Sequence, residues 1–262
     1  MNRWQRMFNR GFGILFWFVV VMPQVQAEEP LKVLLYQPGN PPYTMLDGGS
    51  NKGIFTDMFN RITDITKVRF ELIGRPVARG LAEFDAGRVD VEPGVNPNWR
   101  AHMRVPGLYS MSYAKSVEVV VFAPGKKKPV KVPSDLFGEI VGVVRGFVYP
   151  KFDAAMSAGL ITRLDNLSSD LLLEQLLVGR LDQIFIGYDT ILYMQKIRPE
   201  YRVLEIGNVV DEQDVMLRLH PNKAAYLPLF NQALQQMMKD GEIEKIYSQY
   251  RFVPEGGLNQ PN

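Results

Sequence analysis

The chain has no cysteine and only two histidines among its 262 residues. Without cysteine it carries no disulfide framework and no thiol for redox chemistry. His102 and His220 stand in no H-E-x-x-H pattern, and neither G-x-S-x-G nor G-x-x-x-x-G-K-[ST] occurs. The sequence therefore argues against a metal site, a serine triad and a nucleotide-binding loop, and we expect no cofactor.

An excess of charge of one sign is also missing, since 30 Lys and Arg oppose 28 Asp and Glu. The one basic run, Lys126 to Lys128, follows Pro124-Gly125 and is typical of a solvated turn. A polyanion partner needs a concentrated basic surface. We therefore expect the protein to bind neither nucleic acid nor lipid.

Residues 1–27 have the pattern of a cleavable signal peptide. Three arginines precede an apolar run from Phe12 to Met22, and Val25-Gln26-Ala27 forms a cleavage site. The alternative is an uncleaved membrane anchor. No cysteine follows the apolar run, so a lipid anchor is not expected. Loss of the three arginines leaves 27 basic and 28 acidic residues, a net charge of −1, in a chain that we expect in the periplasm.

Beyond the signal, segments with strand patterns alternate with segments that have the 3.6-residue apolar period of helices. Such alternation with short loops predicts an α/β fold with a mostly parallel sheet flanked by helices, whose ligands bind at the carboxyl ends of strands. The predicted strands cover 31–36, 68–74, 87–93, 116–125, 139–146, 160–166, 180–189 and 215–219, and the predicted helices 54–66, 77–86, 150–158, 170–179, 226–239 and 242–251.

The stretch DVEPGVNPNWR, from Asp90 to Arg100, carries the strongest local signal for a ligand site. A strand breaks at Pro93-Gly94, and a helix is predicted from Asn96, a good N-cap, with Pro97 at its first position. A helix N-terminus attracts anions, and Arg100 adds a bidentate fork for a carboxylate. The pattern indicates a small-anion site, although an ordinary surface turn with an arginine has the same local sequence.

The order of the motifs in the whole chain is more specific than any one of them. The chain reads LKVLLY, PPY, a GRVD strand before the Arg100 turn, LYSMSY, VGVVRG, LLVGRLDQIFIG and ALQQMMKDGEIEKIYSQY. This order resembles the bacterial extracellular solute-binding proteins of family 3, which serve uptake systems for polar amino acids. The resemblance extends from about Leu31 to Arg251.

The resemblance implies the type II periplasmic-binding-protein fold, in which two α/β lobes close on a ligand by hinge motion. It implies a discontinuous first lobe, residues 28–113 and 214–262, and a second lobe, residues 114–213. We place the two hinges near residues 113–115 and 211–214.

The chain departs from the family pattern at several positions that would face the ligand. In the family an arginine after the strand pairs with the ligand's α-carboxylate, and Arg100 matches it, but the usual hydroxyl residues before it are replaced by Gly94-Val95-Asn96. Gly146-Phe147-Val148 lacks the usual Ser or Thr, and Gly187 stands where the family places an Asp for the ligand's ammonium. The departures indicate a ligand other than an ordinary α-amino acid.

Glu92 and Tyr43 are candidates for the rewritten site. Glu92 can accept a hydrogen bond from a ligand donor, or it can instead pair with Arg75 or Arg79 at the cleft rim. Tyr43 can wall the cleft with its ring, or fill the core. The predicted ligand-binding residues are Arg100, with Arg104 as the alternative anchor, Glu92, Tyr43, Asn96, Arg145, Phe147 and Tyr188.

The sequence favours a periplasmic solute-binding protein that captures a small carboxylate-bearing molecule, an amino acid or a derivative, for an ABC-type uptake system. We expect a monomer whose partner is an ABC permease. An alternative is a ligand-sensing module for a membrane receptor. A third is a dehydratase-like enzyme on the same scaffold, with Glu92 as the only candidate acid; the main hypothesis has no catalytic residue.

Overall fold

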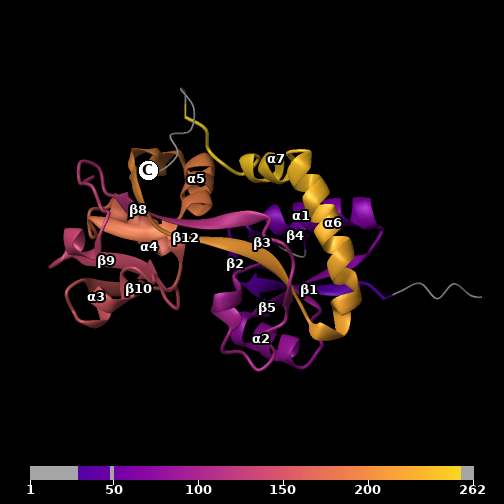
Figure 1. Ribbon diagram of the computed structural model, residues 1–262. Coiled ribbons are helices and arrows are strands. Elements are labelled where there is room, and N and C mark those ends of the chain that lie inside the picture. Colours follow the sequence, from indigo (N-terminus) through magenta and orange to yellow (C-terminus); the bar gives the residue numbers. More distant parts are fainter. Residues whose placement is uncertain (1–28, 48–49, 255–262) are drawn as a thin grey trace, which may run out of the picture.

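The computed structural model describes residues 29–47 and 50–254 (Figure 1). The predicted signal peptide, residues 1–27, lies outside the described residues. Over the described part the chain forms two α/β lobes, as the sequence predicts.

The first lobe has a parallel strand arrangement in which β1 lies between β5 and β6. A small antiparallel sheet, β2-β3-β4, leads into its first helix. The elements are β1 (Leu31–Gln37), β2 (Gly39–Asn40), β3 (Thr44–Asp47), β4 (Ser50–Lys52), α1 (Ile54–Thr66), β5 (Phe70–Pro76), α2 (Val77–Asp85), β6 (Val91–Val95), η1 (Pro97–Arg100), β7 (Leu108–Tyr109), η4 (Pro221–Tyr226), α6 (Leu227–Lys239) and α7 (Glu242–Ser248).

The second lobe repeats the arrangement, with β9 between the parallel strands β10 and β11. Its elements are η2 (Pro133–Leu136), β9 (Ile140–Val144), α3 (Asp153–Ser157), β10 (Thr162–Asn166), α4 (Ser169–Leu177), β11 (Gln183–Gly187), α5 (Tyr188–Ile197) and η3 (Pro199–Val203).

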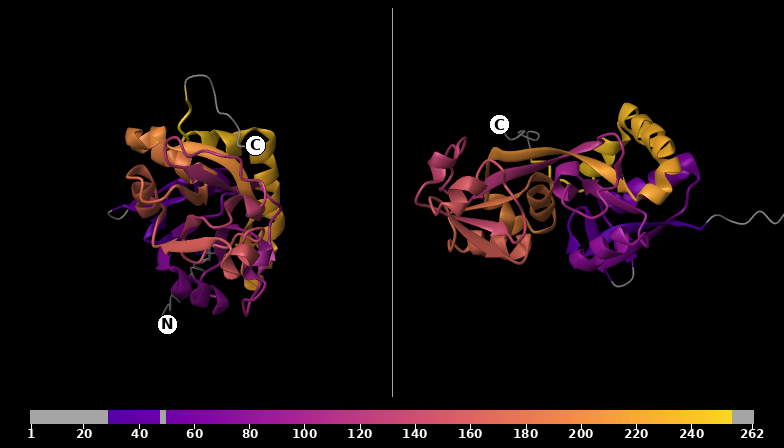
Figure 2. Two further views of the ribbon diagram at one scale, coloured as in Figure 1. Left: turned by 90° about the vertical axis from the view of Figure 1, so that its left-hand side faces the viewer. Right: turned by 60° about the horizontal axis from the view of Figure 1, so that its bottom comes forward.

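Two long antiparallel strands, β8 (Ala114–Phe122) and β12 (Glu205–Leu219), join the lobes (Figures 1 and 2). All main strands therefore form one nine-stranded sheet, in the order β10-β9-β11-β8-β12-β6-β1-β5, with β7 paired to β12. The predicted hinge segments face each other in this ribbon, where Asp214 pairs with Lys115 and Val215 with Ala114. The lobe limits and hinge positions themselves stay predictions.

Each lobe buries apolar side chains on both faces of its strands. In the first lobe, α1, α6 and α7 cover one face around Phe59 and Phe230, while Phe84 of α2 packs on the other. In the second lobe, α4 and α5 cover the face that carries Val119 and Val121, and the α3 side covers Val120 and Phe122. This alternation along β8 is the period of two that a strand buried on both faces requires.

The α/β prediction is confirmed, and the differences are local. The helix predicted after Asn96 is a single 3₁₀ turn of four residues, and the helix predicted over 150–158 is reduced to α3. The predicted strand over 180–189 ends at Gly187, because α5 begins at Tyr188. The polar segment Asp211 to Asp214 does not interrupt β12, since its backbone pairs with β8.

Candidate functional site

Glu92 and Arg100, the two main predicted site residues, contact each other in the first lobe. Arg100 Nη2 donates to Glu92 Oε1 at 2.7 Å, and Arg100 Nε lies 3.1 and 3.3 Å from the two carboxylate oxygens. One whole edge of the guanidinium therefore faces Glu92, in the bidentate geometry that arginine adopts with carboxylates. The donor pair predicted for a ligand carboxylate binds a residue of the chain instead.

A second arginine, Arg218 of β12, holds Glu92 from the other side. It is paired with Glu92 across the β12–β6 ladder, and its Nη1 donates to Glu92 Oε2 at 2.7 Å. Its guanidinium also donates to the carbonyls of residues 105 and 106 and stacks 3.8 Å above the ring of Phe84. Both side chains of this pair are fully buried. A buried charge is tolerated only when it is paired and hydrogen-bonded. Each of these two residues therefore depends on the other to stay charged inside the lobe.

Tyr36, at the end of β1, completes this group, which we call the Glu92 cluster: Tyr36, Glu92, Arg100 and Arg218. Its hydroxyl donates to Glu92 and accepts from Arg100 Nη2. Burial and the charge of Glu92 raise the pKa of Tyr36. Burial lowers the pKa of Arg100, but its bonds to Glu92 and the charge of Glu92 outweigh this and raise it.

The alternative partners predicted for Glu92 were wrong. Arg75 and Arg79 both bind Glu83, at 2.9 and 2.8 Å, because Arg79 and Glu83 lie four residues apart on α2. Glu92 itself has no exposed side-chain surface, so in this arrangement a ligand or substrate does not reach it. Arg104, the alternative anchor, is exposed and donates to the carbonyl of Asp85.

Asn96 acts as the predicted cap, but of a shorter element. Its Oδ1 accepts from the backbone N–H of Asn98 at 2.9 Å, and its Nδ2 donates to the carbonyl of Asp214 at 2.8 Å. The amide therefore ties the turn to β12, and a four-residue 3₁₀ turn has no α-helical N-terminus to offer an anion. Gly94 has a φ of 71°, and a Cβ there would lie 2.5 Å from Phe55. A hydroxyl-bearing residue at that position would be strained.

The lobes contact each other through Tyr43 and Asp189. The Tyr43 hydroxyl donates to Asp189 Oδ2 at 3.0 Å, from the loop before β3 to the first turn of α5. Burial and the charge of Asp189 raise the pKa of Tyr43 well above its ordinary value. A second contact of the same kind joins the Tyr193 hydroxyl to the Met45 sulfur at 2.9 Å. The Tyr43–Asp189 contact lies beside the carboxyl end of β11, the position where ligands bind in open α/β sheets.

The segment after α7 crosses from the first lobe to α5 of the second (Figure 1). Arg251 Nε donates to Asp189 Oδ1 at 2.6 Å, and the Phe252 N–H donates to the carbonyl of Leu192. The guanidinium of Arg202 stacks 4.3 Å above the Phe252 ring. We call residues 249–252 the C-terminal strap; sequence reasoning missed its role because its partners lie about 50 residues or more away.

Glu118, a half-buried acid of the second lobe, is a further residue that sequence reasoning missed. It lies on β8, opposite Asp211 of β12 and Gly187 of β11. Its Oε2 is buried without a hydrogen-bond partner among the described residues. Burial, reinforced by the charge of Asp211, raises its pKa to about 8. The signal was present in the sequence, since a lone acid interrupts the β-branched run SVEVVVF.

The three predicted second-lobe residues lie in two places. Arg145 and Phe147 are exposed on the loop after β9, with Phe147 at 41%. Tyr188 is half-buried in the first turn of α5, beside Asp189. The structure therefore places Tyr188 near the contact between the lobes and leaves Arg145 and Phe147 at the surface. Whether any of them touches a ligand stays a prediction.

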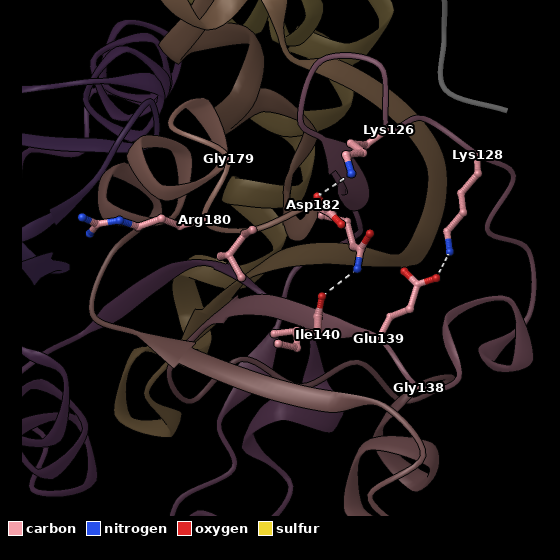
Figure 3. A pocket seen from close by; sticks show the side chains of 10 residues that line it. Lys126, Lys128, Gly138, Glu139, Ile140, Gly179, Arg180 and Asp182 are labelled. Carbon is pink, nitrogen blue, oxygen red and sulfur yellow. Dashed lines mark hydrogen bonds and ion pairs between the residues drawn. The ribbon is translucent and has the colours of Figure 1, made fainter.

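A hollow of about 520 Å³ lies at the opposite end of the second lobe (Figure 3). It is lined by residues before β9 and around the start of β11, and its two lysines pair locally, Lys126 with Asp182 and Lys128 with Glu139. Because it faces the amino ends of the parallel strands β9 and β11, it is not where ligands bind in open α/β sheets.

Over residues 29–47 and 50–254 there is no cluster of potential metal ligands and no helix long and apolar enough to cross a bilayer.

A model of the bacterial extracellular solute-binding proteins, family 3, matches residues 33–253. The chain belongs to this family. The match covers nearly all of the described solute-binding fold, both lobes and the C-terminal strap included. A comparison with curated protein sequences gives no match.

Solved structures show the same fold at low sequence identity. The ligand-binding core of GluR0, in complex with L-glutamate, is 16% identical with a TM-score of 0.71, over 86% of this chain and 99% of that one. An ancestral arginine-binding protein bound to arginine is 20% identical with a TM-score of 0.66, over 84% and 97%. The VFT2 domain of BvgS from Bordetella pertussis is 20% identical with a TM-score of 0.66, over 84% and 93%. At these identities the likeness is one of fold, that of type II periplasmic binding proteins.

Proposed function

We propose that this solute-binding protein captures a small amino-acid-like molecule between its two lobes and delivers it to an ABC-type permease. The family match and the amino acids bound by relatives of the same fold support the ligand class. The signal-peptide pattern of residues 1–27 supports delivery to the periplasm by export. The observation that carries the proposal is the direct contact of Tyr43 with Asp189, which couples the lobes beside the carboxyl ends of the second-lobe strands.

In this proposal the first lobe supplies Tyr43 and the remaining donor of Arg100. Arg100 Nη1 donates to the carbonyl of Trp99 at 3.1 Å, which leaves that nitrogen one further hydrogen. The side chain keeps 16% of its surface exposed. A ligand carboxylate then receives a single N–H from Arg100, in place of the usual two. The second lobe supplies Tyr188 from α5, with Arg145 and Phe147 on the neighbouring loop.

A thermal-shift screen with amino acids, amines and organic acids tests the proposal, because a ligand that binds only the folded state raises its melting temperature. We expect at least one stabilising compound. Tyr43→Phe should reduce its shift, while Tyr109→Phe, a matched tyrosine whose hydroxyl bonds the carbonyl of Pro106 within the first lobe, should leave it unchanged. A complete lack of stabilising compounds contradicts the proposal.

A sensing role is the second candidate, favoured by the BvgS domain and by a histidine kinase sensor domain that is 18% identical with a TM-score of 0.68. Both functions use the same ligand-driven closure, and they differ in the membrane partner that reads it. Cross-linking of the exported protein in intact cells, with and without the stabilising ligand, separates them. Transport predicts capture of a permease, and sensing predicts capture of a receptor.

A further inference from the structure

Glu118 has a buried carboxylate oxygen but no ion pair among the described residues. Over the described residues, every carboxylate in a buried residue lies within 4.0 Å of an Arg or Lys nitrogen. These pairs are Glu83 with Arg75 and Arg79, Asp90 with Lys223, Glu92 with Arg100 and Arg218, and Asp189 with Arg251. Glu118 is partly exposed as a residue, but its Oε2 is buried and has neither an ion pair nor a hydrogen bond among these residues.

The groups next to Glu118 do not supply the positive charge that would balance its carboxylate. Asp211 lies directly opposite on β12 and adds a like charge, which disfavours a second ionised acid at this position. The hydroxyl of Tyr149, a fully buried side chain, also has no partner among the described residues and lies close enough for the charge of Glu118 to raise its pKa. Two acids and a hydroxyl without a partner thus lie together, and Arg163, whose charge acts on Tyr149, binds Asp165 and the carbonyl of Phe147.

The position of Glu118 connects it to the proposed ligand site. Its ladder partner on β11 is Gly187, the last residue before α5, and a Cβ there would lie 3.5 Å from Glu118 Oε1. The absence of a side chain at Gly187 leaves this side of the carboxylate uncovered by β11. Glu118 also raises the pKa of Tyr43, the residue that contacts the second lobe from the first. The carboxylate therefore lies beside the junction of the lobes.

We propose that Glu118, supported by Asp211, receives a cationic side-chain group of the ligand, an ammonium or a guanidinium. The inference rests on the proposed function, since it assigns a ligand class to the same interlobe site. A cation supplies the charge that the protein itself does not provide there, and a carboxylate stabilises it by a charge-assisted hydrogen bond. The Tyr149 and Tyr43 hydroxyls add neutral acceptors to this position. Asp189 is not available for this role, because Arg251 and Tyr43 already bind its two oxygens.

Binding of a cation next to Glu118 requires the carboxylate to be ionised. Because the pKa of Glu118 is raised to about 8, the group carries a proton at pH 7 and releases it when the cation binds. The charged and titratable groups around it are Asp211, Tyr149, Tyr43 and the Asp189–Arg251 pair, with Arg163 and Asp153 acting on Tyr149. Net proton release to the buffer is therefore a direct signature of the interaction.

Calorimetric titration of the full exported chain tests the inference with five probes: L-arginine, L-lysine and agmatine as cations, and L-glutamate and L-leucine as compounds without a side-chain cation. Each titration is run at pH 7 in two buffers of different ionisation enthalpy. The variants are Glu118→Gln, which removes the charge at constant shape, and Glu212→Gln, a matched change at an exposed residue of the same ribbon. Asp211→Asn is a second test variant that serves if Glu118→Gln fails to fold.

We expect at least one cationic probe to bind the parent chain with release of close to one proton. Glu118→Gln should weaken it at least about tenfold and abolish the proton release, Asp211→Asn should weaken it less, and Glu212→Gln should change neither. Cation binding that is equal in Glu118→Gln and the parent, or binding confined to L-glutamate or L-leucine, overturns the inference while the proposed function stands. Absence of binding by all five probes overturns the assignment of a cationic ligand and also counts against the amino-acid-like ligand class.

Discussion

Asp189 accepts a hydrogen bond from Tyr43 of the first lobe on one oxygen and an ion pair from Arg251 of the C-terminal strap on the other. One buried carboxylate, 5% exposed, therefore receives both of these connections between the lobes. The contact depends on the register of α5, which begins directly after β11 and holds Asp189 at its second residue. This arrangement makes the relative position of the lobes sensitive to single substitutions.

Removal of the Tyr43 hydroxyl should loosen the junction without unfolding either lobe. A net hydrogen bond contributes about 1 kcal/mol, so Tyr43→Phe should lower the free energy of unfolding by about that amount and widen the distribution of interlobe distances. Small-angle scattering and single-molecule distance measurements between labelled lobes check this. Tyr109→Phe serves as the control, and equal effects of the two changes would contradict the role given to Tyr43.

Arg251→Ala should be more costly, because it leaves Asp189 buried with its charge unpaired. Loss of one partner of a buried ion pair costs about 3–5 kcal/mol, and the partial exposure of Arg251, 16% of its side chain, puts the expected loss at about 2–3 kcal/mol. The double variant with Asp189→Asn should recover part of this loss in urea unfolding. Additive effects of the two changes would show that the pair is uncoupled.

Glu92→Gln tests whether the Glu92 cluster is structural. The change leaves two guanidiniums, one of them fully buried, without a countercharge, so we expect a loss of about 3–5 kcal/mol in chemical denaturation. Glu83→Gln is the matched control, because Glu83 also binds two arginines, but both are partly exposed, at 32% and 66%. Its loss should be about 1 kcal/mol or less. Similar losses of unfolding free energy at both sites would show that burial of the Glu92 cluster does not increase its contribution to stability.

The stability of the protein should depend on pH through Glu118. Its pKa is raised from 4.5 to about 8 in the folded chain, so between these values the folded state binds more protons than the unfolded state. The contribution is complete below pH 4.5 and is lost as the pH rises through 8. Each pKa unit corresponds to about 1.4 kcal/mol, so the full change is on the order of a few kcal/mol.

Comparison of the parent with Glu118→Gln isolates this term. The variant has no ionisable group at the site, so its stability relative to the parent should rise between pH 5 and pH 9. Urea unfolding at a series of pH values gives the difference directly. A difference that does not vary over this range would show that Glu118 titrates as an ordinary exposed carboxyl.

The sequence predicted the elements well where the signal is local. The helix over 54–66 has the predicted bounds, because the apolar period of a helix is set within a few residues. The partners of the site residues could not be predicted in this way. Glu92 and Arg218 are 126 residues apart, and their pairing follows from the β12–β6 register, which only the assembled sheet defines.

The order of motifs indicates the fold and an interlobe site, but not which side chains of that site are already paired within the protein. Arg100 was predicted as a free anchor because the strand end, the turn and the arginine are adjacent in sequence. That donor pair is already occupied, because it binds the carboxylate of Glu92, eight residues earlier in the chain. The sequence does not single out Glu118, because a run of β-branched residues predicts a buried strand whether or not one of its residues is acidic.

A crystal structure of the protein with a stabilising compound tests the central claim most directly. We expect the ligand between the lobes, in contact with Tyr43 or Arg100 on one side and with Glu118 or Tyr188 on the other. A ligand bound within a single lobe, or in the hollow between Lys128 and Arg180 at the far end of the second lobe, would contradict it.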